Sequence, residues 1–406
     1  MNQYYIPDVA STGHLLAELA QEAARLGREV SVITSFPSYG PPATWQACKA
    51  REVCEGVRVW RMSTTRFGKD SLIGRALNSA TFLVPLGIRM LLTRSRGRIF
   101  MYTSNPPFLG IIGGIVSLFR RHDYIVLLHD SYPHLAVLVG KIKVGSVIEW
   151  AWHQVNRLFY RRARQTIVLC DKAKELVVRE YGVSPNRVQV IHNWADPKML
   201  RPVPKVECAF ARQYGYDAKF TLLYSGNLGL YYEFDTILEA ANRLRDDLGF
   251  RLVFVGSGGK KASIERRIAE LRLPNVDVHQ YQPFEALNDS LNSCDASLVT
   301  IAKGVEGISF PSKFYSSLAV GKPLLALSEP GSELQHMVER TSSGLWSPIG
   351  DTNALLANLA ELRADPARAV VMGRLAREAL EKHFTIETAT REYLRVVDLA
   401  AAERDP

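Results

Sequence analysis

Several short segments combine glycines, small polar residues and single charged side chains, a pattern typical of loops that bind anions. The first is PDVASTG, which ends at Gly13 and leads directly into a helical pattern. Glycine and small side chains let the backbone N–H groups of a helix N-terminus approach an anion closely. A plain capped turn explains this segment equally well, because Ser11 or Thr12 would cap the helix.

Two further segments are glycine turns that each follow an apolar run of strand length. YSGNLG contains Gly226, Asn227 and Gly229, and an asparagine between two glycines suits a pyrophosphate group. VGSGGKK contains Gly256 and Lys260 and leads into a helical pattern. A lone turn of this second kind is not specific. A lysine at a helix N-terminus is nevertheless unfavourable unless an anion lies there, which favours a binding role.

The most specific constellation is the segment EGISFPSK, which runs into a helical pattern. It contains Glu306, Ser309, Ser312 and Lys313. Lys313, near the start of the helix, indicates a phosphate ligand, because a lysine ammonium is a point charge well suited to phosphate. Glu306 has the chemistry to hold a sugar hydroxyl or to stabilise positive charge.

One segment of the first half, LLHDSYP, places His129 and Asp130 immediately after a buried strand. A His-Asp pair at the end of a strand can orient an acceptor hydroxyl or shuttle its proton. The alternative is a histidine that simply hydrogen-bonds to a backbone carbonyl. The other histidines lack metal-ligand spacing and no Asp-x-Asp occurs, so we expect no divalent metal at the diphosphate.

The elements that must position these residues alternate between apolar strands and amphipathic helices, as in parallel α/β folds. In the first half, strands are expected at 29–34, 57–62, 99–102, 124–128, 166–169 and 188–191. Helices are expected there at 13–26, 72–93, 109–121, 147–162 and 172–181. Only MNQYYI precedes the first loop. Either the first strand is very short or the chain begins downstream of the true start, and we favour the second.

A proline-rich break at 193–206 separates the two halves, after which the alternation restarts. Strands are then expected at 221–224, 251–255, 276–279, 296–300 and 323–326. Helices are expected at 234–245, 260–271, 283–291 and 312–320. The pattern predicts two doubly wound α/β domains that face a central cleft. Ligands of such folds bind beyond the carboxyl ends of the strands, where the segments above lie.

Length and composition agree with two folded domains. A chain of 406 residues is longer than a single hydrophobic core usually supports. Its content of 47% hydrophobic and 22% charged residues is that of a folded protein and argues against disorder. Five scattered cysteines without a CxxC pair indicate reduced thiols in a cytosolic protein. The first residues are polar and lack the apolar core of a signal peptide.

The net charge of +9 is unevenly distributed. Residues 1–200 contain 26 Lys and Arg against 14 Asp and Glu, whereas residues 201–406 contain 24 against 27. A basic first half suggests an anionic partner. Nucleic acid is not expected, because the basic residues are not interleaved with aromatics in a known module.

One stretch, 71–98, combines apolar side chains with basic ones and has no acidic residue. Its basic residues are Arg75, Arg89, Arg94, Arg96 and Arg98. The longest uncharged run, 76–88, is shorter than the roughly 20 residues needed to span a bilayer, but such a segment can lie in the interface. A second stretch, 150–164, extends this surface through Arg157, Arg161 and Arg162. The alternative is that 72–92 is an ordinary core helix.

Several of these segments, in sequence and in order, resemble the family 4 glycosyltransferases that act on bacterial surface polysaccharides. They include PDVASTGHLLAELAQEAARLGREVSVIT, HDSYPHLAVLVG, VIHNWAD, LLYSGNLGL, LVFVGSGGK and GISFPSKFYSSLAVGKPLLAL. The resemblance implies the GT-B fold, with an acceptor-binding Rossmann-like domain at 1–200 and a nucleotide-sugar-binding domain at 201–385. It also implies a last helix, near 386–400, that packs back on the first domain.

The activity implied is retaining, metal-independent transfer of a sugar from a nucleotide-sugar donor, with UDP favoured and GDP possible. Docking of 71–98 at the membrane interface suits a polyprenyl-diphosphate-linked glycan as the acceptor, and the enzyme is expected in the cytoplasm, peripherally bound to the anionic inner-membrane surface. Donor contacts are expected at Gly13, Gly226, Asn227, Gly229, Gly256, Lys260, Gln280, Tyr281, Gln282, Ser309, Ser312 and Lys313. Catalytic roles are expected for His129, which matches a family position, and for Asp130 and Glu306.

The sequence departs from the family pattern of two glutamates eight positions apart. Ser316 occupies the second position, and Glu306 is the candidate to replace the first. Asn227 and Leu230 lie where the family often has an Arg and a Lys that bind the donor phosphate. Lys313 is therefore expected to take over part of this phosphate binding. These departures keep two alternatives open: a GT-B enzyme that does not transfer sugar, such as a sugar-nucleotide epimerase, and a non-catalytic sugar-nucleotide-binding subunit.

Overall fold

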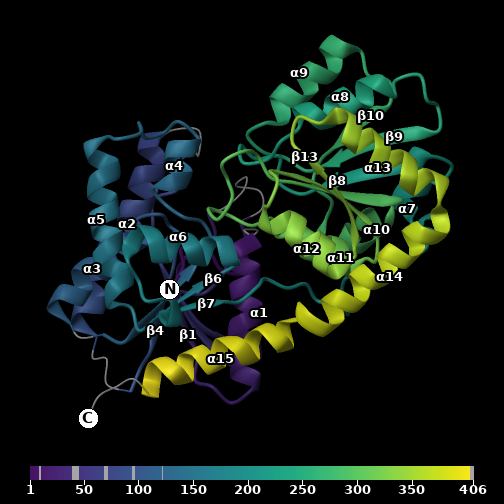
Figure 1. Cartoon of the computed structure of the whole chain (residues 1–406). Helices are drawn as coiled ribbons and strands as arrows, with labels where there is room; N and C mark the ends of the chain where they lie inside the picture. Colours follow the sequence, from purple (N-terminus) through teal and green to yellow (C-terminus); the bar gives the residue numbers. More distant parts are fainter. Residues whose placement is uncertain (9–10, 39–44, 68–71, 94–96, 121, 403–406) are drawn as a thin grey trace. The chain divides into compact units, whose positions relative to one another are not determined.

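A computed structural model describes residues 1–8, 11–38, 45–67, 72–93, 97–120 and 122–402. The chain divides into two compact units (Figure 1). Unit 1 comprises Met1–His192, Gly307–Ser309 and Ile386–Pro406, and unit 2 comprises Asn193–Glu306 and Phe310–Thr385. The proline-rich segment assigned as the linker, 193–206, therefore belongs to unit 2 from its first residue.

All five cysteines are free thiols, as expected.

Unit 1 contains two sheets. The larger one has the order β4-β5-β6-β7 and is parallel throughout. Its strands are β4 (Phe100–Thr103), β5 (Tyr124–Leu128), β6 (Gln165–Val168) and β7 (Val188–Val190). Every residue of β5 and β6 is buried, as the apolar sequence of β5 predicts for a strand covered on both faces. The four strands expected from the sequence are confirmed.

The smaller sheet has the order β1-β3-β2 and corrects the expectation of an entirely parallel fold. Its strands are β1 (Ser31–Ser35), β2 (Arg51–Cys54) and β3 (Val57–Met62). Strand β2 was not predicted, and it pairs with β3 in antiparallel fashion. Glu55 and Gly56 both have positive φ, which is the conformation required for a two-residue hairpin turn with the right twist. The sequence signal was this Glu-Gly pair between two short runs of strand-forming residues.

The first three residues lie between the two sheets of unit 1. The Asn2 N–H donates to the Ile33 carbonyl, and the Ser35 N–H donates to the Gln3 carbonyl, so this segment pairs with β1. On its other side, the Thr103 N–H donates to the Met1 carbonyl at the end of β4. The segment MNQ thus links β1 and β4 through backbone hydrogen bonds without forming an assigned strand.

The helices expected in unit 1 are confirmed within two residues at each end. They are α1 (Ser11–Arg25), α2 (Leu72–Leu92), α3 (Leu109–Phe119), α5 (Val147–Arg162) and α6 (Asp171–Tyr181). The five-residue α4 (His134–Leu138) was not predicted, because it is too short to show a helical period. The last helix, α15 (Ile386–Ala402), packs on α1 within this unit.

Unit 2 is built on one parallel sheet with the order β10-β9-β8-β11-β12-β13. Its strands are β8 (Phe220–Ser225), β9 (Phe250–Val255), β10 (Val276–His279), β11 (Ala296–Thr300), β12 (Leu324–Ser328) and β13 (Gly344–Pro348). The chain runs outward from β8 to β10 and then returns to the other side of β8. This is the doubly wound arrangement, whose switch point lies beside β8.

Helices cover both faces of this sheet (Figure 1). On one face, α8 (Asp235–Arg243), α9 (Lys261–Leu271) and α13 (Thr352–Ala364) share a core with Leu222 and Tyr224. On the other, α7 (Ala209–Tyr214) packs with Leu223, as the alternation of side chains along a strand requires. The remaining helices are α10 (Leu287–Asn292), α11 (Lys313–Ala319), α12 (Glu333–Thr341) and α14 (Pro366–His383).

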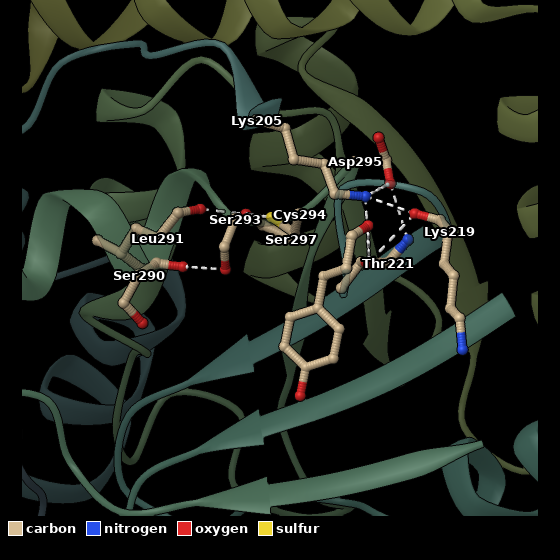
Figure 2. Close-up of polar contacts among 10 residues, drawn as sticks. Lys205, Lys219, Thr221, Ser290, Leu291, Ser293, Cys294, Asp295 and Ser297 are labelled. Carbon is tan, nitrogen blue, oxygen red and sulfur yellow. Dashed lines mark hydrogen bonds and ion pairs between the residues drawn. The ribbon is translucent and has the colours of Figure 1, made fainter. Parts of the chain in front are cut away.

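The end of the linker is fixed to the amino-terminal edge of this sheet by one lysine (Figure 2). The Lys205 ammonium lies 2.5 Å from the Asp295 carboxylate and donates to the Thr221 hydroxyl at 3.1 Å. The same carboxylate accepts from the Thr221 N–H at 2.7 Å. These polar contacts lie at the opposite end of the strands from the glycine turns and therefore anchor the fold.

Candidate active site

The glycine turns of unit 2 lie together because the strands before them are neighbours. The Gly226 N–H donates to the Val255 carbonyl, and the Gly256 N–H donates to the His279 carbonyl, both at 2.9 Å. The Leu228 N–H donates at 2.9 Å to the carbonyl of Ser257 in the next turn. The loops after β8, β9 and β10 therefore form one surface at the carboxyl edge of the sheet.

Two glycines in this surface are required by the close approach of the neighbouring backbone. Gly256 has φ +152°, and a Cβ there would lie 1.9 Å from the Gly226 carbonyl oxygen. Gly258 has φ +159°, and its Cβ would lie 2.4 Å from the side-chain oxygen of Asn227. Since a side chain would both clash and strain the backbone, the surface between these turns consists of main chain.

Lys313, the first residue of α11, lies against this surface. Its side chain is 8% exposed, and its ammonium lies 3.5 Å from the ring centroid of Tyr232 and 4.6 Å from that of Tyr224. Burial lowers the pKa of Lys313 well below its usual value. Within the part of the chain that the structure describes, the ammonium has no hydrogen-bond or ion-pair partner. An anion bound at this point would supply the missing partner and keep the lysine charged.

Lys260 is held by the chain itself. Its ammonium donates to the Tyr232 carbonyl at 2.7 Å, and its backbone N–H donates to the Leu228 carbonyl at 2.8 Å. The lysine therefore connects the turns after β8 and β9. Two donors of its ammonium are left over for a ligand.

The residues after β10 are exposed at the same edge. The hydroxyl of Tyr281 donates to the Ser257 carbonyl at 3.4 Å, so this ring is placed beside the second glycine turn. Gln282 donates from its amide to the Gln280 carbonyl at 3.1 Å. The segment offers an aromatic face and backbone groups at the end of the surface.

Glu306 and Ser312 occupy helix N-termini in unit 2. The Glu306 carboxylate accepts a hydrogen bond of 2.8 Å from the backbone N–H of Glu333, the first residue of α12. A carboxylate at this position is stabilised by the helix dipole, which is a structural reason for a glutamate there. Ser312 is exposed at the start of α11 and makes no capping hydrogen bond.

His129 and Asp130 lie in unit 1 and are positioned by Ser104. Its hydroxyl oxygen accepts hydrogen bonds from the backbone N–H groups of both residues, at 3.0 and 3.1 Å. Burial lowers the pKa of His129 to about 4, so its imidazole is neutral at physiological pH. Burial raises the pKa of Asp130, and a hydrogen bond from the Ser309 hydroxyl opposes that rise. Ser309 belongs to unit 1, and its hydroxyl forms a hydrogen bond with the Asp130 carboxylate there.

Gly13 lies inside the first turn of α1, and not in a loop as expected. A Cβ at this position would lie 3.2 Å from the carbonyl carbon of Tyr4. The glycine thus permits the helix to pack closely against the amino-terminal segment. Residues 9 and 10 of the expected loop lie outside the described residues.

Sequence reasoning missed two residues that shape these sites, Tyr232 and Ser104. Tyr232 supplies the ring beneath Lys313, and the Tyr-Tyr pair two residues after Gly229 was the available signal. Ser104 follows β4, one strand away from His129, so only the sheet order reveals its role.

Taken together, unit 2 holds a main-chain surface with a buried, unpaired lysine beside it, at the switch point of a doubly wound sheet. Backbone N–H groups and an ammonium are suited to a diphosphate, and an exposed tyrosine at the edge suits a base. Two Rossmann-like units, each built on a parallel sheet, define a protein of the GT-B architecture.

Comparison with known families identifies the class further. Residues 12–194 match the glycosyl transferase 4-like domain, and residues 210–379 match the glycosyl transferases group 1. The chain belongs to the GT-B glycosyltransferases assembled from these two domains. The expected fold and family are thereby confirmed.

Individual relatives cover nearly the whole chain. It is 26% identical to a protein of Escherichia coli K12 named for colanic acid biosynthesis, the glycosyl transferase WcaI, over 96% of this chain and 97% of WcaI. It is 25% identical to WbjE of Pseudomonas aeruginosa, a glycosyltransferase by name, over 84% and 82%. Among solved structures, HepE of Anabaena in complex with UDP superposes with a TM-score of 0.71 at 14% identity, covering 98% of both chains. HepE has also been solved with UDP-glucose.

Proposed function

We propose that this glycosyltransferase moves a sugar from a UDP-sugar to a polyprenyl-diphosphate-linked glycan, with retention of anomeric configuration, in the synthesis of a bacterial surface polysaccharide. The observation that carries the proposal is the Lys313 ammonium, which is buried beside the glycine turns and has no hydrogen-bond or ion-pair partner among the described residues. UDP in HepE and the name of WcaI support the donor base and the pathway class. GDP-sugars are the second choice of donor, because their diphosphate would bind to the same lysine and glycine turns.

The transfer step breaks the bond between the anomeric carbon and the diphosphate, so negative charge grows on the departing UDP. Lys313 would stabilise that charge together with the backbone N–H groups of the glycine turns. Lys260 has spare donors on the same surface. The sequence has no Asp-x-Asp, and the donor surface is cationic, so we propose that the transfer itself needs no metal.

His129 and Asp130 would serve the acceptor side of the reaction. The His129 imidazole is neutral, and its buried Nδ1 has no hydrogen-bond partner among the described residues. It would form a hydrogen bond with an acceptor hydroxyl once the side chains that cover Nδ1 move aside. Asp130, held by Ser309, would stabilise positive charge at the anomeric carbon or receive a proton. Glu306 keeps its candidate role only if its carboxylate can leave the N-terminus of α12.

The acceptor class is proposed from the surface of unit 1. One face of α2 is buried through Phe82, Leu86 and Met90. The other face exposes Val84, Ile88 and Leu92, so the alternative of an ordinary core helix holds for only half of it. Neighbouring α3 exposes Ile115, Leu118 and Phe119, and the two helices are in contact. This exposed apolar surface of α2 and α3 suits the interface of a bilayer.

A second exposed apolar group lies at the start of α5 and next to two exposed lysines. Its residues are Val144, Val147, Ile148 and Trp150, and the lysines are Lys141 and Lys143. Such a mixture of apolar and basic side chains favours anionic headgroups, each basic residue adding about 1 kcal/mol. Among the described residues no helix is both long and apolar enough to cross a membrane. We therefore propose peripheral attachment to the cytoplasmic side of the inner membrane.

Three arginines predicted for this surface have other partners. Arg161 and Arg162 donate to the carbonyls of Tyr181 and Ser117, and Arg157 donates to the Glu180 carbonyl. They tie α5 to α6 and α3, so their main contribution is structural. Arg89 lies over the ring of Trp60, at 3.9 Å. Arg94 and Arg96, and the side chain of Arg75, lie outside the described part of the chain.

The experiment that tests the function supplies UDP-, GDP- and ADP-sugars to the purified chain with and without a polyprenyl-diphosphate-linked glycan. We expect UDP release that depends on the acceptor, with a product of retained configuration by NMR. Turnover of the sugar nucleotide without any acceptor would favour the epimerase alternative. Nucleotide binding without turnover against a membrane extract would favour a non-catalytic subunit.

A further inference from the structure

A second cluster of functional side chains lies in unit 1. His134 is the first residue of α4, His153 lies in α5 and Glu180 is the penultimate residue of α6. One ligand atom from each residue lies within 4.8 Å of the other two. No other group of this kind occurs among the residues that the structure describes. No sequence pattern predicts this group, because the three residues are 19 and 27 positions apart along the chain.

The three side chains face one another without being paired. Among the described contacts, no hydrogen bond or ion pair joins any two of them. The imidazole rings of His134 and His153 are 5.0 Å apart at 89°, so they approach a common point from different directions. Arg179 contacts one oxygen of the Glu180 carboxylate, at 3.1 Å, which leaves the other oxygen available. A simple ion pair therefore does not account for the grouping.

The orientation of His134 is fixed by a neighbour. Its Nδ1 lies 3.0 Å from the Ser131 hydroxyl oxygen, which directs Nε2 away from Ser131. Histidines that bind metals typically use one ring nitrogen for the ion and the other for a hydrogen bond of this kind. The ring of Tyr181, with centroid distances of 5.8 and 6.5 Å, packs against both imidazoles and limits their rotation.

We propose that His134, His153 and Glu180 bind a divalent transition-metal ion of the zinc class. Two imidazoles and one carboxylate form a common zinc ligand set, which leaves a fourth position for water. Magnesium and calcium are disfavoured, because they prefer oxygen ligands throughout. Around a zinc ion with its usual bond lengths, tetrahedral ligand atoms lie about 3.3 Å from one another. Small rotations of the three side chains would therefore bring their ligand atoms within bonding distance of one ion.

The bound ion would tie three helices together at one point. It would also fix the start of α4, and through Ser131 the loop that carries Asp130. The site is therefore expected to stabilise unit 1 and to order the loop after β5. This inference does not depend on the proposed transfer reaction, because the metal acts on the fold and not on the donor phosphates.

The test uses the full chain without a histidine tag, treated with EDTA and then desalted. Zinc is added, and bound metal per chain is measured by mass spectrometry after desalting, together with the melting temperature. We expect about one tightly bound zinc per chain and a rise in melting temperature that magnesium does not produce. Cobalt in place of zinc should produce visible absorption bands of a four- or five-coordinate ion.

His153→Gln and Glu180→Gln keep the size of each side chain and should each weaken zinc binding at least 100-fold. Ser131→Ala should weaken it about tenfold, as for a residue that orients a ligand. The matched control is His336→Gln, an exposed histidine of α12, which should change nothing. Equal zinc binding by all these variants would overturn the proposal. If a variant does not fold, the absence of cobalt bands in the wild-type chain overturns it equally.

Discussion

The ammonium of Lys313 lies 3.5 Å from the ring centroid of Tyr232. Tyr232 follows Gly226, the first glycine of the turn after β8, by six residues. The ring face attracts the cation but cannot replace the hydrogen bonds that it would have in water. The lysine is thus held in place, with its donors unused, at the point where the glycine turns meet.

Replacing Lys313 with alanine should weaken UDP binding by about 1.5–3 kcal/mol, the range for hydrogen bonds to charged groups. Isothermal titration calorimetry measures this as a decrease in affinity of roughly 10- to 150-fold. Lys303→Ala is the control, since Lys303 is exposed and belongs to the same unit. Unchanged affinity in Lys313→Ala would remove this residue from the donor site.

The two neighbouring glycines 258 and 259 provide a second matched pair. A Cβ at Gly258 would lie 2.4 Å from both Asn227 and the Leu228 carbonyl oxygen, whereas one at Gly259 would meet only Leu230, at 3.4 Å. Gly258→Ala should therefore lower the free energy of unfolding by about 1–3 kcal/mol and reduce UDP affinity, because the turn must open. Gly259→Ala should be nearly neutral in thermal unfolding and calorimetry. Similar effects from both substitutions would contradict the packed-turn interpretation.

Treatment with EDTA should distinguish the transfer reaction, which needs no metal, from the proposed metal site at His134, His153 and Glu180. With saturating donor and acceptor at low temperature, UDP release should persist in EDTA, because Lys313 and backbone N–H groups meet the leaving-group charge. Its rate should fall only as far as loss of the ion disturbs the loop that carries Asp130, and zinc rather than magnesium should restore it. The same treatment should lower the melting temperature through loss of the ion at His134, His153 and Glu180. Turnover that disappears with EDTA and returns with magnesium would refute metal-independent transfer.

The buried His129 makes stability sensitive to acid. Burial lowers the pKa of His129 to about 4, whereas the unfolded chain has the ordinary value near 6.5. As pH falls through this window, only the unfolded state takes up the proton, so the free energy of unfolding falls by about 1.4 kcal/mol per pH unit. Urea unfolding of His129→Gln from pH 7 to pH 4, in EDTA, should show a smaller loss than wild type. His336→Gln should retain the wild-type slope.

Membrane attachment predicts co-sedimentation with anionic vesicles, weakened by salt, and little binding to neutral ones. The double variant Ile88→Ser and Leu92→Ser removes two exposed apolar side chains of α2 and should reduce binding about tenfold or more. Leu248→Ser is the control, since Leu248 is even more exposed than these two residues but belongs to unit 2. Equal binding to both vesicle types, or none, would exclude peripheral attachment while leaving the transfer reaction untouched.

The fold class and the positions of many helices and strands could be predicted from the amino-acid sequence. Short runs such as 124–128 and 296–300 have the length and β-branched content of buried strands, and the longer amphipathic patterns between such runs favour helices that cover them. The glycine turns and Lys313 were visible for the same reason, since a turn after a strand depends on local backbone conformation. The family resemblance rested on these local patterns and on their order.

The tertiary structure alone decided which side chains meet. The partnership of Lys313 with Tyr232 depends on the order of strands in the sheet, which no local pattern encodes. The antiparallel β2 and the five-residue α4 were missed because they are too short to display a period. His134, His153 and Glu180 lie on three separate helices, and only the packing of those helices brings them within reach of one ion.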